Sequence, residues 1–293
     1  MTALTIAEAT TPMVVTRPGV YDLPEDVYHG DPVPGGSLSS SGAKKLLASC
    51  PAIFRYEQLN PPKSRRVFEF GTVVHGLVLG SGPEVVIVEA ENWRTNKAKA
   101  EAEEAHARGA VPVLRKEYQQ AVAMADALRK DPVAGGLFQP GRGLPERSLF
   151  WQDVRSGVWL RARLDWLPNR GPGRMVVLDY KTAASAHPAA IRKAVAEYGY
   201  HQQAAWYMDA VRALGLARDV AFLFVFQEKE PPYLPTVVEL DRNALREGRE
   251  LNRKAISLYR ECVTSGRWPG YSDSIELVRL PAWAQSPRRQ ETL

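Results

Sequence analysis

Three short apolar runs separated by turn-forming links constrain the fold of this chain more than any other feature. They span residues 148–154, 158–167 and 175–181, and the links between them read RSG and PNRGPGR. Strand-favouring residues stand in the runs, whereas Gly, Pro and Asn stand in the links. Strands joined by such short links run antiparallel, because a parallel pair needs a crossover of about a dozen residues or more. The sequence therefore predicts a meander in the middle of the chain.

Helical periodicity and further strand-like runs flank the meander. Helical patterns cover the stretch from the serines at 39–41 to Pro51, then 68–79, 95–130 with a break near Gly109 and Pro112, 188–214 and 241–265. Strand-like runs lie at 84–89, 221–227 and 236–240. The expected fold class is α/β (α+β), with a mixed central sheet whose meander is flanked by helices. The serines are explained by capping of the first helix, because no Ser/His/Asp arrangement for nucleophilic catalysis is legible.

Length and composition indicate one core domain. The chain has 293 residues, of which 45% are hydrophobic and 24% charged, as in soluble globular proteins. Residues 1–18 are rich in Thr, Ala and Pro, and we expect a mobile tail there. A single domain is expected over 19–280, with a helical insertion around 93–131 and a second mobile tail over 281–293.

Charge and cysteine content narrow the class of protein. The formal net charge of +5 and the pI near 9.2 favour a polyanionic partner. Cys50 and Cys262 are too few for a disulfide framework or a four-cysteine metal site, so a reducing, cytoplasmic setting is expected. No run approaches the ~20 apolar residues of a membrane helix, and the start of the chain does not read as a secretion signal.

The last two strands of the meander carry a pattern of acids and bases. Side chains alternate along a strand, so Asp179 and Lys181 share one face. On the preceding strand Arg161, Arg163 and Asp165 share a face, and pairing of the two strands would bring Asp165 close to Asp179. Two carboxylates beside a lysine suit Mg²⁺, which prefers oxygen ligands. A surface salt bridge is the alternative, because such pairs are common and contribute little stability.

Six stretches in a fixed order make the chain resemble the PD-(D/E)XK nucleases, and within them the RecE-like (exonuclease VIII) and RecB-like exonuclease branch of phage or prophage type. They read LSSSGAKKLLASCPAIFRY, FGTVVHGLVL, ERSLFW, GVWLRARLDWL, VVLDYKTA and YHQQAAWYMDA, and the resemblance extends from about residue 21 to residue 271. It implies a restriction-endonuclease-like core. It also implies that Asp165 and Asp179 bind metal, that Lys181 is catalytic, that His75 is a further ligand, and that the backbone carbonyl of Tyr180 faces the metal.

Other positions match the family less securely. Glu146 matches an acid that precedes the meander, although its PER context reads as a loop, and Leu164 stands where the name-giving Pro would be. Gln203 and Tyr207 match a Q-x-x-x-Y signature that borders the active site. Their spacing alone is equally consistent with a polar helix face and a Tyr packed in the core. His75 taken alone would be read as a buried core histidine.

The resemblance also implies a reaction and partners. The reaction would be hydrolysis of DNA phosphodiester bonds with Mg²⁺, for which Mn²⁺ would substitute, from the ends of double-stranded DNA in the 5′ to 3′ direction during recombination or end resection. Arg161 and Arg163 would contact phosphates. The protein would work beside a single-strand annealing protein, as a ring-like homo-oligomer and without a membrane. Two alternatives remain open, namely an endonuclease of the same fold and a non-catalytic DNA-binding module. Two cysteines exclude the iron-sulfur cluster usual in CRISPR-adaptation nucleases.

Overall fold

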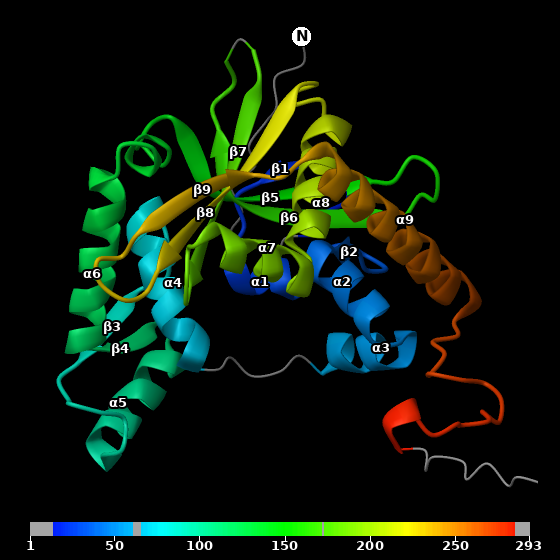
Figure 1. Ribbon diagram of the computed structural model, residues 1–293, viewed down its shortest axis with the longest axis horizontal. Helices are drawn as coiled ribbons and strands as arrows, with labels where there is room; N and C mark the ends of the chain where they lie inside the picture. Colours follow the sequence, from blue (N-terminus) through cyan, green and yellow to red (C-terminus); the bar gives the residue numbers. More distant parts are fainter. Residues whose placement is uncertain (1–13, 61–65, 172, 285–293) are drawn as a thin grey trace, which may run out of the picture.

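The computed structural model describes residues 14–60, 66–171 and 173–284, and within them a central sheet has helices on both faces (Figure 1). The strand order is β1-β5-β6-β7-β8-β9, and β2 adds to β6. The strands are β1 (Gly19–Tyr21), β2 (Leu38–Ser39), β5 (Gly143–Gln152), β6 (Trp159–Pro168), β7 (Met175–Ala183), β8 (Val220–Glu228) and β9 (Pro235–Glu239). Strands β5, β6 and β7 form the predicted antiparallel meander, and the parallel pair β7–β8 makes the sheet mixed. The predicted fold class is confirmed.

Helices fill the connections that the sheet requires. They are α1 (Glu25–His29), α2 (Ser40–Ala48), α3 (Pro51–Leu59), α4 (Arg66–Leu79), α5 (Asn96–Ala107), α6 (Arg115–Lys130), α7 (Pro188–Glu197), α8 (Tyr200–Ala213) and α9 (Arg242–Ser265). The parallel strands β7 and β8 are joined through α7 and α8, as a parallel crossover demands. The hydroxyl of Ser39 accepts a hydrogen bond from the Gly42 amide at 3.0 Å, so the serine cluster caps α2 as predicted, and Pro51 begins α3.

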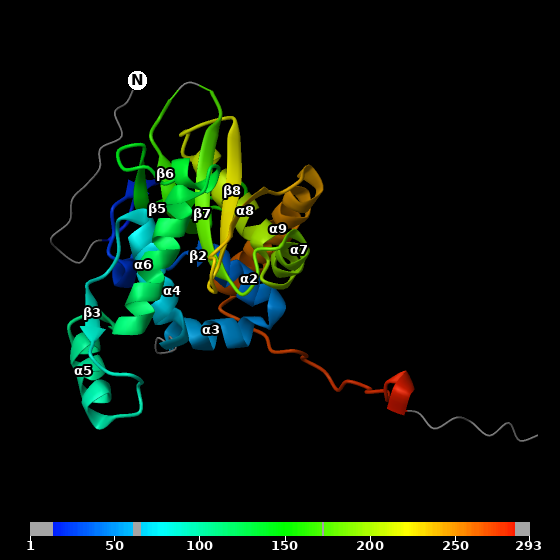
Figure 2. The same ribbon diagram turned by 60° about the vertical axis from the view of Figure 1, so that its left-hand side comes forward.

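Each face of the sheet packs against its own layer of helices (Figure 2). Along β7 and β8 the side chains alternate: Val177 and Phe224 lie in the core shared with α2, α8 and α9, whereas Leu178 and Val225 lie in the core shared with α4 and α6. Both cores are almost inaccessible to solvent. The strands in the middle of the sheet are therefore fixed from both sides, which is what a precisely placed set of charged side chains needs.

The predicted helical insertion also contains a strand. β4 (Val111–Leu114) pairs in parallel with β3 (Val85–Val88), and α5 connects them. Pro112 was expected to break regular structure, but a two-stranded sheet has only edge strands, where the missing N–H of a proline is tolerated. The helical insertion expected around 93–131 thus has a strand at the predicted break between its two helices.

The N-terminal segment joins the fold earlier than predicted. Val15 is buried, and its amide donates to the carbonyl of Pro32 at 2.8 Å. The expected tail over 1–18 is thus corrected for Val15, while residues 1–13 lie outside the described residues. Of the expected tail over 281–293, only residues 281–284 are described. No described helix is both long enough and apolar enough to cross a membrane.

Helices α8 and α9 touch at Gly248, and this contact yields a stability prediction. A Cβ atom at Gly248 would lie 2.2 Å from the carbonyl oxygen of His201, which belongs to a helix backbone and cannot swing away. We expect Gly248→Ala to lower the free energy of unfolding by ~1–3 kcal/mol, because overpacking outweighs the better helix propensity of Ala. Urea denaturation measures this. Glu247→Ala, at the exposed neighbouring position, is the control, and equal stability of the two variants would contradict the close contact.

Candidate active site

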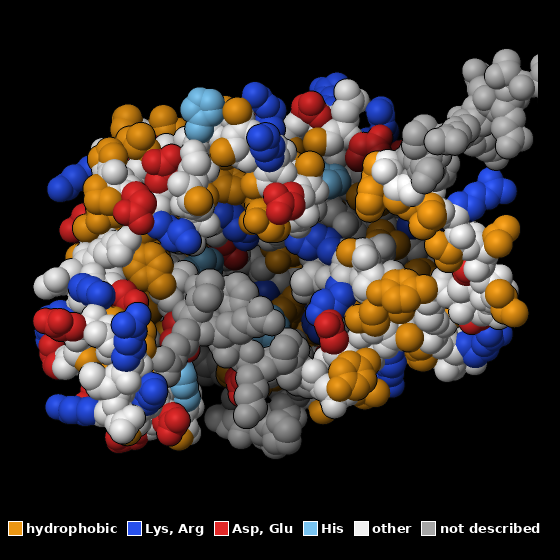
Figure 3. Space-filling model, turned by 60° about the horizontal axis from the view of Figure 1, so that its bottom comes forward, with side chains coloured by type: hydrophobic (Ala, Val, Ile, Leu, Met, Phe, Trp, Pro, Cys, Tyr) orange, Lys and Arg blue, Asp and Glu red, His pale blue; other side chains and the backbone are white. Residues whose placement is uncertain are grey.

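Charged and polar side chains from five elements meet at one place on the meander. Strand β7 contributes Asp179 and Lys181, and β6 contributes Asp165. The remaining members of this acid cluster are His75 on α4, Glu146 on β5 and Gln203 on α8. Seen from the side of α3, α4 and α5, the surface is hollowed between its two halves, with His, Lys and Arg side chains exposed around the hollow (Figure 3).

Asp165 links three of these elements. Its Oδ2 accepts a hydrogen bond from the Tyr180 amide at 2.8 Å and lies 3.0 Å from Nε2 of His75. The other imidazole nitrogen, Nδ1, lies 3.1 Å from Oε1 of Glu146. Oε2 of Glu146 accepts from Nε of Arg163 at 2.6 Å. A continuous chain of hydrogen-bonded charges therefore runs from β7 to β5 through the histidine.

Asp179 is the most deeply placed acid, with a side chain that is 0% exposed. Its Oδ1 accepts from Nε2 of Gln203 at 2.6 Å, and its Oδ2 lies 2.5 Å from the ammonium of Lys181. Among the described residues Oδ2 has no hydrogen bond of good geometry besides this ion pair. The structure thus places Gln203 directly on a predicted metal-binding acid.

Glu146 lies in a strand, which corrects the loop expected from its PER context. It stands opposite Asp165 in the β5–β6 pair, where the otherwise regular pairing is interrupted, and its φ is 55°. A non-glycine residue pays of order 1–3 kcal/mol for such a backbone, and bulge-like distortions re-aim side chains. Consequently Leu164 and Trp166, two residues apart, pack in opposite cores, and Asp165 turns toward β7.

The two aspartates are driven in opposite directions by their surroundings. Burial and the neighbouring Asp165 raise the pKa of Asp179 to about 7, although Lys181 partly offsets them. Burial would also raise the pKa of Asp165, but His75 and Lys181 outweigh it and hold that pKa below its usual range. Burial alone would lower the pKa of His75, whereas Asp165 and Glu146 raise it to about 10. Acids with separated pKa values are typical of catalytic sites.

The two arginines predicted to contact phosphates are engaged within the protein. Nη1 of Arg161 lies 2.6 Å from Oδ2 of Asp31 and donates to the Ser37 carbonyl at 2.8 Å. Arg163 holds Glu146 and donates to a carbonyl of the N-terminal segment. These contacts favour a structural role for both arginines, so DNA contact by either stays a prediction.

Tyr207 is also partly buried. Its ring packs edge-on against Phe222 at a centroid distance of 5.7 Å, and burial raises its pKa well above the usual value. The side chain of Tyr180 points into the core on the α4 and α6 face, where its hydroxyl donates to Gln227 at 2.5 Å. Tyr180 therefore meets the acid cluster through its amide, which binds Asp165, and through its ring, whose centre lies 6.1 Å from that of His75.

Lys44 on α2 is a neighbour of the site that the sequence analysis missed. Its ammonium donates to the Tyr198 carbonyl at 3.0 Å and lies 5.8 Å from the centre of the Tyr200 ring, while the Lys181 ammonium lies 5.6 Å from the same ring. Burial and Lys181 lower the pKa of Lys44 to about 8. Its position three residues before Leu47, on the border of the apolar face of α2, was the available signal.

Lys44 is held by the loop between α7 and α8. Gly199 has a φ of 62°, and a Cβ there would lie 2.9 Å from Cδ of Lys44. Glycine is thus required both by the left-handed backbone and by the lysine side chain that crosses it. The loop places a second cation beside Lys181.

The donor set fits a hard divalent cation, although no metal arrangement is preformed. Within the described part of the chain, no three His, Cys, Asp or Glu side chains are grouped as metal ligands. His75 instead bridges Glu146 and Asp165. Carboxylate oxygens and a main-chain carbonyl are nevertheless the ligands that Mg²⁺ prefers, and Oδ2 of the buried Asp179 still lacks a directional partner. Asp165, Asp179, Glu146, His75 and the Tyr180 carbonyl would hold such an ion.

Comparison with known proteins agrees with this geometry. The model of the family described as "PDDEXK-like domain of unknown function (DUF3799)" matches residues 39–281. The chain belongs to this family. Family membership places the acid cluster in a PDDEXK-like domain, a class that generally uses divalent metals.

Solved structures support the same fold. The crystal structure of a protein from Eubacterium rectale named "putative exonuclease" aligns with 84% of this chain and 90% of that chain, at 14% identity and a TM-score of 0.55. At this identity the match speaks for the fold alone. A second structure, SSO0001, covers 77% of this chain and 84% of its own at 13% identity, and its TM-score of 0.29 is too low to support an argument. A search of curated proteins gave no match.

The proximity of the two lysines yields a titration prediction. Replacing Lys181 by Met removes the like charge beside Lys44, and this favours the charged form of Lys44. We therefore expect the pKa of Lys44 to rise in Lys181→Met, as followed by NMR titration of ¹³C-methylated lysines. Lys130→Met, on the opposite side of the sheet, should leave it unchanged. An unmoved Lys44 midpoint in Lys181→Met would contradict the shared environment.

Proposed function

We propose that this protein is a metal-dependent deoxyribonuclease whose active site is the acid cluster. One observation carries the proposal: the buried Asp179–Lys181 ion pair on β7 lies beside Asp165, whose Oδ2 accepts from the amide of the intervening Tyr180 at the interruption in the meander. A surface salt bridge was the alternative interpretation of the D-x-K motif. Asp179 is completely buried and is held by Lys181 and Gln203, which argues against a surface salt bridge. Burying a charge costs free energy, and such buried, perturbed groups cluster at functional sites.

The residues of the chain can be given roles. A divalent cation held by the carboxylates would polarise the scissile phosphate and activate water. Asp179 and Asp165 raise the pKa of Lys181 despite its burial, so its ammonium stays charged and stabilises the negative charge that develops on phosphate. Gln203 and the Tyr180 amide keep the two aspartates oriented. Lys44 adds a second positive charge for the phosphate beside Lys181.

We further propose an exonuclease that acts on the ends of linear double-stranded DNA in the 5′ to 3′ direction, in recombination or end resection, beside a single-strand annealing protein and as a homo-oligomer. This finer proposal rests on the resemblance of the flanking stretches, chiefly LSSSGAKKLLASCPAIFRY and the late SGRWPGYSD, to the RecE-like branch. The acids set the chemistry, whereas access of a strand end to them is a geometric condition.

Loss of either central charge should abolish cleavage. Lys181→Ala removes charge stabilisation, and Asp179→Ala removes a metal-binding carboxylate, so we expect each to reduce the cleavage rate by more than ~100-fold in Mg²⁺ or Mn²⁺. Initial rates on end-labelled duplex measure this, and circular dichroism checks that the variants fold. Asp209→Ala, an ion-paired acid on the solvent side of α8, is the matched control. Near-normal turnover by either site variant would refute the assignment.

End dependence separates the exonuclease from its rivals. With Mg²⁺, linear duplex should yield mononucleotides and a growing 3′ overhang, while covalently closed circles survive, because the strand must enter from an end. Equal degradation of both substrates would indicate an endonuclease with the same metal site. Binding without cleavage of either, under every divalent metal tried, would indicate a DNA-binding module.

A further inference from the structure

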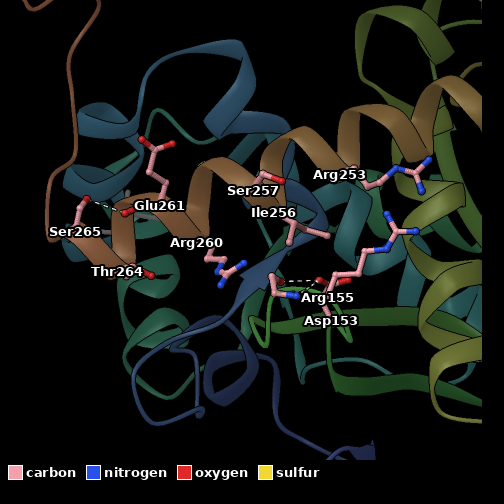
Figure 4. A pocket seen from close by; sticks show the side chains of 10 residues that line it. Asp153, Arg155, Arg253, Ile256, Ser257, Arg260, Glu261, Thr264 and Ser265 are labelled. Atoms are coloured by element: carbon pink, nitrogen blue, oxygen red, sulfur yellow. Dashed lines mark hydrogen bonds between the residues drawn. The ribbon is translucent and has the colours of Figure 1, made fainter.

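A second cationic site lies apart from the acid cluster, between α9 and the turn that joins β5 to β6. The pocket there encloses about 490 Å³. Three arginines line it, with Arg155 in the turn and Arg253 and Arg260 on α9, and we call it the arginine pocket (Figure 4). Segments about a hundred residues apart in sequence thus direct guanidinium groups into the same space.

These arginines are not neutralised by the described part of the protein. None of the three has a hydrogen bond or ion pair with a described residue, and Arg155 and Arg253 point toward one another (Figure 4). The nearby carboxylates are directed elsewhere. Asp153 and Glu261 also line the pocket, but Asp153 accepts from the amide of Ser156 at 2.8 Å and from its hydroxyl at 2.6 Å, and the Glu261 side chain extends to the other side of α9 from Arg260 (Figure 4). Facing like charges repel, and an anion between them would remove that cost.

The spacing of the arginines indicates an extended anion. Arg253 and Arg260 are seven residues apart on one helix face, a rise of ~10 Å. A single small anion cannot reach both ends of that span. Each strand of duplex DNA carries one phosphate per ~3.4 Å of helix axis, so several phosphates would lie over the same length. Guanidinium groups bind phosphate through paired hydrogen bonds, and Ser257 and Thr264 add hydroxyl donors to the lining.

The sheet fixes the separation between this pocket and the acid cluster. Strand β5 runs from Glu146, in the cluster, to Gln152 beside the turn. Six residues of extended chain span ~20 Å. That distance corresponds to roughly six base pairs of duplex.

We propose that the arginine pocket binds the phosphodiester backbone of the substrate duplex about six base pairs from the scissile bond, without cutting it. The inference rests on the proposed function, since it takes DNA as the polyanion. In this proposal the pocket holds the uncut part of the duplex, so the contribution of the pocket to binding affinity depends on the length of the DNA.

The test uses hairpin DNAs with stems of 5 and 20 base pairs, the first too short to reach from the acid cluster to the pocket. The triple variant Arg155→Ala/Arg253→Ala/Arg260→Ala should bind the long stem at least ~10-fold more weakly at low salt, with binding measured by fluorescence anisotropy in EDTA. Its slope of log affinity against log salt should fall by up to ~3, about 0.9 for each lost phosphate contact. Binding of the short stem should change less than twofold. The control Arg218→Ala/Arg242→Ala/Lys254→Ala removes the same charge from other exposed positions and should leave both stems unaffected.

Each outcome bears on the proposal. The pocket assignment would be overturned if the triple variant weakened binding of both stems equally or of neither stem. It would also be overturned if the control variant weakened binding of the long stem as much as the triple variant does. Replacement of the three arginines by Lys, which keeps the charge, should restore the salt slope and part of the affinity. Cleavage of both stems in Mg²⁺ is measured in parallel. If neither protein cuts while the length-dependent binding loss is seen, the proposed nuclease function fails and the pocket stands.

Discussion

The burial of the Asp179 carboxylate is the constraint on which the rest of the site depends. A carboxylate with no exposed surface persists only if paired and hydrogen-bonded. Lys181 supplies the charge from the same strand, and Gln203 supplies the hydrogen bond from α8. That bond exists because β7 and β8 are a parallel pair, which forces the chain through a helical crossover and lays α8 on this face. The parallel strand pair of the mixed sheet requires the crossover, and the crossover in turn positions Gln203 at the site.

A second constraint is the backbone at Glu146. The sequence analysis placed Asp165 on the face of Arg161 and Arg163, but Leu164 and Trp166 pack in opposite cores, so the alternation of β6 is broken at Asp165. The interrupted pairing and the positive φ of Glu146 turn Asp165 toward the Tyr180 amide instead. The N-terminal segment stabilises this distortion, because Arg163 joins Glu146 to the carbonyl of Leu23. The strained backbone at Glu146 is thus held in place by contacts with the N-terminal segment.

Much of this was predictable from sequence, and the failures have physical reasons. Alternation correctly placed Asp179 and Lys181 on one face, because β7 is regular and buried on both sides. The position of Glu146 in a strand was not predictable, since a positive φ at a non-glycine residue leaves no local signal. The partner of Arg161 was hidden for another reason: Asp31 lies 130 residues earlier, and no local pattern links the two positions. Site residues supplied by the resemblance alone, such as His75, stay predictions until metal binding is measured.

The acid cluster is balanced in charge without any bound ion. Three carboxylates, those of Glu146, Asp165 and Asp179, face three cationic groups, those of Arg163, His75 and Lys181. This balance explains how the fold tolerates acids so close together.

The same balance determines how substitutions at the site must be interpreted. Removing Lys181 alone leaves Asp179 buried against Asp165 with only Gln203 to stabilise it, so a loss of activity in that variant would be accompanied by a loss of stability. Removing Asp179 alone leaves the Lys181 ammonium with Asp165 as its remaining acid. Removing both keeps the net charge of the cluster and eliminates the two groups to which the proposed function assigns the chemistry. The double variant therefore separates chemistry from folding in a way that neither single variant can, because a buried ion pair acts as a unit.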